Sequence, residues 1–261
     1  MKNLINFKNK NILITGAAGF VGKALTKKYY ELGANLYLTD LKIEKKYKKF
    51  KYKNVKQKIF LRDCNLENNL ELSCMLEDIK KKFKFIDIII NNAAIAGNSI
   101  KKGWNVNFEK QSFEGWERSI NVNLSVIFKI IQSCKNKLKT NTSSIVNVSS
   151  IYGIVGPNYK IYKGTKINNP AGYAVSKSGL IHLTKWLAST LAPGIRVNCI
   201  SPGGIFRGQD KKFIKNYIDQ CPLSRMASED DVVNSCIFLT SNLSNYITGH
   251  NLVVDGGWTI I

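Results

Sequence analysis

Residues 11–22, Asn-Ile-Leu-Ile-Thr-Gly-Ala-Ala-Gly-Phe-Val-Gly, decide the fold of this 261-residue chain. The apolar run at their start is typical of a buried strand, and the glycines that follow open a helix. Gly16 permits a tight turn, Gly19 lets the backbone approach a diphosphate, and Gly22 lets the helix pack closely on the sheet. Because N–H groups at a helix N-terminus attract anions, strand, turn and helix in this order predict a dinucleotide site.

The rest of the chain repeats this alternation of short apolar runs and longer helical patterns. The expected strands are Asn11–Thr15, Asn35–Asp40, Lys58–Arg62, Ile86–Asn91, Ser144–Ser149, Arg196–Ser201 and Asn251–Asp255. The expected helices are Phe20–Leu32, Leu66–Phe83, Phe113–Leu138, Pro170–Leu191 and Ser228–Leu243. Several runs are apolar nearly throughout, as parallel strands covered on both faces require. The pattern predicts an α/β fold: one doubly wound (Rossmann-type) parallel sheet of seven strands, with helices on both faces, in a single domain spanning residues 1–261.

Three longer connections interrupt the alternation, at about residues 97–111, 156–169 and 203–219. Each follows the carboxyl end of a strand, which is the edge where open α/β sheets bind ligands. Long connections at that edge are typical of loops that shape a substrate site or close over it.

The cofactor preference depends on Asp40, which ends the second strand 18 residues after Gly22. A carboxylate at this point can accept hydrogen bonds from both ribose hydroxyls and repels a 2′-phosphate. We therefore expect NAD in preference to NADP. Lys42, Lys45 and Lys46 lie close by in the sequence and can offset the repulsion, which leaves NADP open.

The formal net charge of +21 comes from 39 Lys and Arg against 18 Asp and Glu, and nearly all of the excess is lysine. Such an excess suits nucleic acid or an anionic membrane. No recognition motif or RNA-stacking pattern accompanies it, so we interpret it as a solvated surface and expect no nucleic-acid or membrane partner. Its positive field would still help to gather phosphorylated or carboxylated substrates.

The cysteines and histidines indicate whether a metal site is expected and in which cellular compartment the protein functions. No two of the six cysteines form a Cys-x-x-Cys pair, and all fall in apolar segments, which is typical of small core residues in a reducing compartment. With only His182 and His250, neither a metal site nor a Ser–His–Asp triad is predicted. No signal-like segment or membrane-length apolar run occurs, so we expect a cytoplasmic protein.

Tyr173 and Lys177 place a phenol and an ammonium four residues apart, on one face of a predicted helix. A phenol of ordinary pKa about 10 is a poor base near neutrality. A neighbouring cation stabilises the phenolate and moves its pKa toward the working range. The pair alone is equally consistent with a surface contact, so the rest of the pattern decides its meaning.

With its other motifs, the chain resembles the short-chain dehydrogenase/reductase family over essentially its whole length. The matching motifs are the Gly16/Gly19/Gly22 turn, Asn91-Asn92-Ala93-Ala94, Asn121-Val122-Asn123-Leu124, Val148-Ser149-Ser150, the Tyr173/Lys177 pair, Ser201-Pro202-Gly203-Gly204 and Val254-Asp255-Gly256-Gly257. The resemblance implies an NAD(P)-dependent oxidoreductase that interconverts an alcohol and a carbonyl.

The resemblance also implies a role for each matching residue. Tyr173 would be the acid in reduction and the base in oxidation, while Lys177 lowers its pKa and holds the nicotinamide ribose. Ser150 would hydrogen-bond the substrate oxygen, and Asn123 would anchor a water that links Lys177 to solvent. The implied cofactor-binding residues are Gly16, Gly19, Phe20, Val21, Gly22, Asp40, Asn65, Leu66, Asn91, Ala93, Tyr173, Lys177, Pro202, Gly203 and Ile205.

The chain departs from the family pattern at four places. Its glycines are spaced T-G-x-x-G-x-x-G, whereas the compact branch more often has T-G-x-x-x-G-x-G. Ala94 replaces a glycine, and Asn65 stands where an aspartate usually contacts adenine, although an amide can make that bond. Arg207 lies near a usual cofactor-contacting threonine, which puts that contact in doubt and offers a cation beside the substrate.

The segment between Ser150 and Tyr173 is about ten residues longer than is usual in the family. With residues 203–206 and 213–217 it resembles a bacterial subgroup called flagellin modification protein A, associated with surface-sugar biosynthesis. Its polar side chains suit a small, hydroxylated, sugar-type substrate, and they leave a phosphorylated or nucleotide-linked form open. These side chains are Asn158, Tyr159, Lys160, Tyr162, Lys163, Thr165 and Lys166, joined by Arg207.

Two other functions stay open from the sequence. One is a 3-oxoacyl-(acyl-carrier-protein) reductase whose lysine-rich surface docks an acidic carrier protein. The other is a non-catalytic, cofactor-sensing protein, which the complete set of Asn123, Ser150, Tyr173 and Lys177 argues against. The family resemblance further implies a homo-oligomer, a tetramer built on the long helices 113–138 and 170–191 with the C-terminal segment.

Overall fold

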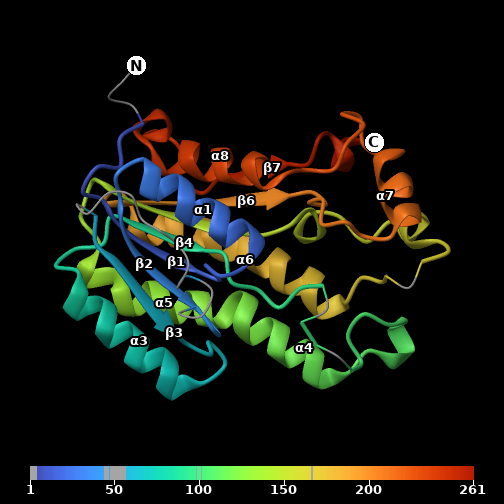
Figure 1. Cartoon of the computed structure of the whole chain (residues 1–261), viewed down its shortest axis with the longest axis horizontal. Coiled ribbons are helices and arrows are strands. Elements are labelled where there is room, and N and C mark those ends of the chain that lie inside the picture. Colours follow the sequence, from blue (N-terminus) through green and yellow to red (C-terminus); the bar gives the residue numbers. More distant parts are fainter. Residues whose placement is uncertain (1–4, 44–46, 48–56, 98, 101, 166) are drawn as a thin grey trace.

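The computed structural model describes residues 5–43, 47, 57–97, 99–100, 102–165 and 167–261. Its centre is a parallel sheet of seven strands in the order β3-β2-β1-β4-β5-β6-β7, with helices on both faces (Figure 1). The strands are β1 (Asn11–Thr15), β2 (Asn35–Asp40), β3 (Ile59–Asp63), β4 (Ile88–Asn91), β5 (Ser143–Val148), β6 (Ile195–Pro202) and β7 (Asn251–Val254). The predicted doubly wound, Rossmann-type sheet is confirmed.

The sheet is apolar on both faces because each face has its own helical layer. Ile12 and Ile14 of β1 belong to one core cluster, with residues of α1 (Phe20–Glu31) and α8 (Glu229–Thr240). Leu13 points to the other cluster, with residues of α3 (Asn69–Lys82), α5 (Val126–Cys134) and α6 (Ala171–Leu191). Alternate side chains of one apolar strand thus fill two cores, as in other buried parallel sheets.

The order of the strands reverses at β1: β2 and β3 lie on one side of it, and β4, β5, β6 and β7 lie on the other. β1 pairs with β2 on one side and with β4 on the other, each in parallel register. This is the topological switch point, where open α/β sheets form a crevice at the carboxyl ends of their strands. The glycine turn after β1 opens at that edge.

The predicted helix over residues 113–138 is helical through residue 137, but it is not one regular α-helix. The structure has α4 (Phe113–Ile120), a π-helical turn (Asn121–Ser125), α5 and a final 3-10 turn (Lys135–Lys137). The apolar periodicity of the sequence continues through the π turn, so it does not indicate where the α-helix is interrupted. Tertiary hydrogen bonds of Asn123 accompany the π turn, and π turns are frequent at functional sites.

Other boundaries differ by a few residues. α3 begins at Asn69, not at Leu66, because the side chain of Asn68 accepts hydrogen bonds from the N–H groups of Leu70 and Glu71. Residues 203–219 are not all loop, since they contain α7 (Lys211–Ile218), which Asp210 caps. α8 ends at Thr240, three residues before the predicted end.

Among the residues that the structure describes, none of the helices has the length and the apolar character of a membrane span.

Candidate active site

Two adjoining cavities open at the carboxyl ends of the strands. The first measures about 440 Å³ and contains the glycine turn, and the second measures about 740 Å³ and contains Ser150 and Tyr173. Phe20, Ala96 and Arg207 line both. Of the predicted cofactor residues, Gly16, Gly19, Phe20, Val21, Gly22, Asp40, Asn65, Leu66 and Ala93 line the first cavity, and Phe20, Tyr173, Gly203 and Ile205 line the second.

The glycine turn fits a diphosphate. Gly16 has φ +65°, and a Cβ there would lie 2.7 Å from the Cα of Ala93. Gly22 is packed more tightly, since a Cβ would lie 2.1 Å from the carbonyl oxygen of Gly16. Gly19 occupies the N-cap of α1, and no described side chain caps this helix. The first N–H groups of α1 therefore remain available to an anion at the cavity wall.

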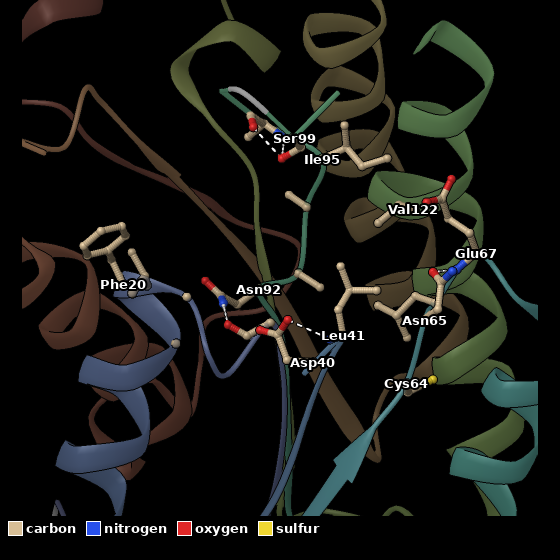
Figure 2. Close-up of a pocket in the computed structure, with 18 of the residues that line it drawn as sticks. Phe20, Asp40, Leu41, Cys64, Asn65, Glu67, Asn92, Ile95, Ser99 and Val122 are labelled. Carbon is tan, nitrogen blue, oxygen red and sulfur yellow. Dashed lines mark hydrogen bonds between the residues drawn. The ribbon is translucent and has the colours of Figure 1, made fainter. Parts of the chain in front are cut away.

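Asp40 joins the end of β2 to this turn. Its carboxylate accepts hydrogen bonds from the N–H of Ala18 (2.8 Å) and from the N–H of Leu41 (2.7 Å). Figure 2 shows Asp40 and Leu41 beside Asn92 in the cavity. Each carboxylate oxygen thus has one backbone donor and keeps a lone pair for a further donor, such as a ribose hydroxyl. Of the nearby lysines, Lys45 and Lys46 lie outside the described residues.

Loops after β3 and β4 complete the first cavity. Thr15 Oγ1 accepts hydrogen bonds from the N–H groups of Asn92 and Ala93, each at 3.1 Å, and fixes the β4 loop to β1. At the opposite end, Arg118 makes a bidentate pair with Glu67 at 2.7 and 2.9 Å. Both Arg118 and Glu67 line the cavity beside Asn65, although neither was predicted from the sequence. Their contact joins positions 51 residues apart, so no local pattern indicates it.

Ser150, Tyr173 and Lys177 come together where β5 ends and α6 begins. Tyr173 and Lys177 lie one turn apart on α6, with Lys177 Nζ 5.8 Å from the centroid of the Tyr173 ring. Lys177 is 2% exposed, and its Nζ donates to the carbonyl oxygen of Val148 at 2.7 Å. Ser149 Oγ donates to the carbonyl oxygen of Lys177 at 2.8 Å, which anchors α6 to the end of β5.

Burial shifts both titratable groups of this cluster. It raises the pKa of Tyr173 above its ordinary value, while a hydrogen bond with Ser150 acts in the opposite direction. Burial lowers the pKa of Lys177 to about 8. The effect that opposes burial at Tyr173 thus comes from Ser150, and the lowering of its pKa by Lys177 remains a prediction.

Four predicted site residues line neither cavity: Asn91, Asn123, Lys177 and Pro202. Asn123 is fully buried on the π turn; its Oδ1 accepts from the N–H of Ile95 (2.7 Å), and its Nδ2 donates to the carbonyl of Ile95 and to Ser176 Oγ. Its side chain thereby fixes the loop after β4, and the expected water relay stays a prediction. Asn91 donates to Asn147 at 2.8 Å, deeper in the sheet.

The second cavity is rich in phenols and amides. Besides Ser150 and Tyr173, its lining includes Asn105, Tyr152, Tyr162, Asn168, Asn169, Arg207, Gln209 and Tyr217. Tyr217 Oη accepts a hydrogen bond from the N–H of Gly204 at 2.7 Å and lies where a Cβ of Gly203 would clash with it. Arg207 pairs with Glu229 and lies over the Phe20 ring, 4.5 Å from its centroid. The roles of Asn169, Tyr217 and Glu229 were not anticipated from the sequence.

The described residues contain no group of three or more His, Cys, Asp or Glu side chains that could hold a metal ion. A glycine turn at a helix N-terminus, continuous with a phenol–hydroxyl–ammonium cluster, instead defines the class: a dehydrogenase or reductase that uses a nicotinamide dinucleotide.

Comparisons with known proteins agree with this class. A family model described as enoyl-(acyl carrier protein) reductase matches residues 16–259. The chain is 32% identical to the post-translational flagellin modification protein A of Campylobacter coli, covering 96% of this chain and 98% of that protein. It is 31% identical to the 3-oxoacyl-(acyl-carrier-protein) reductase FabG of Thermotoga maritima, covering 98% and 100%.

A solved structure gives the same result. The crystal structure of a short-chain dehydrogenase from Leptospira borgpetersenii, with bound NAD+, is similar with a TM-score of 0.84 and 36% identity over 97% of this chain and 94% of that chain. The chain therefore belongs to the short-chain dehydrogenase/reductase family, whose members are NAD(P)-dependent oxidoreductases. The expected family and the resemblance to flagellin modification protein A are confirmed.

Proposed function

We propose that this protein interconverts an alcohol and a carbonyl on a small, polar, sugar-type substrate, with NAD(H) as the preferred cofactor, in the synthesis of surface-glycan precursors. The observation that carries this proposal is the second cavity, in which Ser150 and Tyr173 share one space with three further phenols and four side-chain amides. Such a lining offers donors and acceptors to several hydroxyl groups. The similarity of the chain to the post-translational flagellin modification protein A of Campylobacter coli supports a role in surface-glycan synthesis.

The proposed mechanism assigns one proton transfer to the chain. In reduction Tyr173 Oη donates a proton to the carbonyl oxygen, and in oxidation it accepts one from the alcohol. Ser150 Oγ donates a hydrogen bond to the same oxygen and stabilises the charge that develops there. Lys177 keeps a positive charge behind the phenol. The chemistry that a bound nicotinamide supplies is donation of a hydride in reduction and its acceptance in oxidation.

The pH dependence of reduction follows from the pKa of Lys177, about 8. Below pH 8 Lys177 is charged and stabilises negative charge on the Tyr173 oxygen, whereas above pH 8 this stabilisation is lost. Because the pKa of Tyr173 is raised, the phenol keeps its proton over this range. We expect kcat/KM for the carbonyl to be constant at lower pH and to fall as the pH rises past about 8. Rates of NADH oxidation between pH 6 and 10 measure this, and a flat profile would contradict it.

The preference for NAD is attributed to the charge of Asp40. Asp40→Asn keeps a carbonyl acceptor for the backbone N–H of Ala18 or Leu41 but removes the charge. Two charges 4 Å apart near a protein surface interact by about 4 kcal/mol. Loss of even a third of this repulsion shifts a preference by about tenfold.

We therefore expect kcat/KM for NADPH, relative to NADH, to rise at least about tenfold in Asp40→Asn. Asp63→Asn is the matched control, since Asp63 ends the neighbouring strand in register with Asp40 but lies outside both cavity linings. A wild-type protein that prefers NADPH would refute the assignment.

One alternative function has specific support. The similarity to a 3-oxoacyl-(acyl-carrier-protein) reductase over nearly the whole chain favours a thioester substrate. The two functions separate when NADH and NADPH oxidation is followed with a panel of ketoses and cyclic hydroxyketones beside acetoacetyl thioesters. Turnover of the hydroxyketones supports the proposal. Turnover of acetoacetyl thioesters alone replaces it with the alternative.

We also propose a cytoplasmic homotetramer. Large apolar side chains are exposed on the outer faces of α4, α5 and α6, namely Phe113, Trp116, Phe128, Val175 and Trp186. Exposed apolar side chains on neighbouring helices suit a protein interface. All six cysteines are free, and five of them are buried, which suits a reducing compartment. Native mass spectrometry measures the number of subunits, and a monomer would contradict the proposed tetramer.

A further inference from the structure

The longer segment between Ser150 and Tyr173 brings two phenols and one amide together in the wall of the second cavity. The hydroxyls of Tyr152 and Tyr162 hydrogen-bond to each other. The side chain of Asn169, just before α6, opposes the effect of burial on the pKa of both phenols. All three residues line the cavity that contains Ser150 and Tyr173. We call Tyr152, Tyr162 and Asn169 the phenol–amide cluster.

The cluster is held rigidly beside the reacting groups. The N–H of Tyr152 donates to Ser150 Oγ at 3.2 Å. The Tyr152 ring meets Trp258 edge-on at 6.3 Å, and the Tyr162 ring stacks on Phe213 at 5.8 Å. Both phenols are thus packed by aromatic neighbours and cannot rotate freely. Preorganised polar groups of this kind are typical of specificity sites.

One acceptor of the cluster is left without a partner. Asn169 is 5% exposed, and among the described residues its Oδ1 has no hydrogen-bond partner. A buried acceptor without a partner is costly, and its presence in a native protein calls for an explanation. A hydroxyl group of a ligand in the cavity would supply the missing donor.

The chemistry of the cluster favours a neutral hydroxyl over an anion. Burial raises the pKa of Tyr152 and of Tyr162, so both phenols are uncharged and can each donate and accept. Tyr162 lines the same cavity as Tyr173, and the N–H of Tyr152 donates to Ser150 Oγ at 3.2 Å, so the cluster adjoins the two groups that meet the reacting oxygen. A hydroxyl bound by the cluster therefore lies near the carbon whose oxygen meets Ser150 and Tyr173.

We propose that the phenol–amide cluster is a hydroxyl-binding subsite that selects substrates carrying a hydroxyl on the carbon next to the reacting one, that is, α-hydroxyketones and vicinal diols. The inference rests on the proposed function and narrows its substrate class. It makes Tyr152, Tyr162 and Asn169 specificity-determining residues. Tyr173 and Ser150 act on the reacting oxygen, and the cluster acts on its neighbour.

The experiment compares 2-hydroxycyclohexanone with cyclohexanone, which differ by the one hydroxyl in question, as substrates for NADH oxidation. We expect the wild-type protein to prefer the hydroxyketone at least about tenfold in kcat/KM, and Tyr152→Phe and Tyr162→Phe each to reduce that preference about tenfold. Tyr159→Phe is the matched control. Tyr159 lies on the same segment and was expected from the sequence to suit the substrate, but it is 58% exposed and does not line this cavity. Its preference should equal that of the wild type.

A wild-type preference near one, or a preference unchanged in both cavity variants, overturns the subsite. Absence of turnover with every hydroxyketone overturns the proposed function instead. In that event the subsite is tested by calorimetric binding of 1,2-cyclohexanediol against cyclohexanol to the protein saturated with NADH. Tighter binding of the diol, weakened in the two variants but not in Tyr159→Phe, supports it. Equal binding of the two alcohols overturns it.

Discussion

Tyr173→Phe is expected to lower kcat for carbonyl reduction by a factor of about 10² to 10⁴, the usual contribution of a positioned general acid. The substitution removes only the hydroxyl group, so the ring keeps its place on α6 beside Lys177. The hydrogen bond with Ser150 is lost, but Ser150 can still bind the substrate oxygen. Because the glycine turn and Asp40 in the first cavity are unchanged, NADH binding should stay close to that of the wild type.

Single-turnover rates with NADH and the best carbonyl of the panel measure this effect. Tyr246→Phe removes the same hydroxyl from a fully exposed tyrosine and should leave kcat unchanged. Equal rates in Tyr173→Phe and the wild type would show that Tyr173 does not transfer the proton. A loss of NADH affinity of the same size as the loss of kcat would mean that the Tyr173 hydroxyl holds the cofactor and is not the acid.

The fold could be predicted from the sequence because its determinants are local. The run from Ile12 to Ile14 is apolar at every position, and such a run requires helices on both faces of the sheet. The glycine turn is equally local, since Gly16 and Gly22 lie within seven positions and meet in space. The strand order was not predicted from the sequence, because it depends on which strands pair across long connections.

The site was predictable only in part, because several of its contacts join distant positions. Asn123 bonds the backbone of Ile95, and the π turn that carries it interrupts a helix whose apolar pattern is continuous. Arg207 was noted as a cation beside the substrate, but its pairing with Glu229, 22 residues on, and its contact with Phe20 are tertiary. Local periodicity does not indicate contacts between distant positions. Lys166, which was also named for its polarity, lies outside the described residues.

The phenol–amide cluster illustrates the same limit. The sequence shows that Tyr152 and Tyr162 belong to a polar segment, but it does not show that their hydroxyls meet. Asn169 was not singled out at all, because an asparagine before a proline is ordinary in a loop. Its unpartnered oxygen emerges only when the cavity is assembled from residues 150–173 and 203–217.

Gly22→Ala is the second change with a large expected effect. A Cβ at this position would lie 2.1 Å from the carbonyl oxygen of Gly16 and 2.6 Å from the Cα of Ala17, so backbone must move. Displacing α1 from the turn shifts the N–H groups that face the first cavity. Overpacking of this kind costs about 1 to 3 kcal/mol in the free energy of unfolding. We also expect the affinity for NADH to fall at least about tenfold, since 1.4 kcal/mol corresponds to that factor.

Gly156→Ala is the control that isolates the contact from the loss of a glycine. Nothing lies within 4 Å of a Cβ at Gly156, and its φ is not positive, so this substitution should leave both the unfolding midpoint and the NADH affinity unchanged. Denaturant unfolding and NADH titration of the two variants give the comparison. If Gly22→Ala folds and binds NADH as tightly as the wild type, the α1 N-terminus does not bind the diphosphate. Binding at that point requires α1 to lie against the glycine turn.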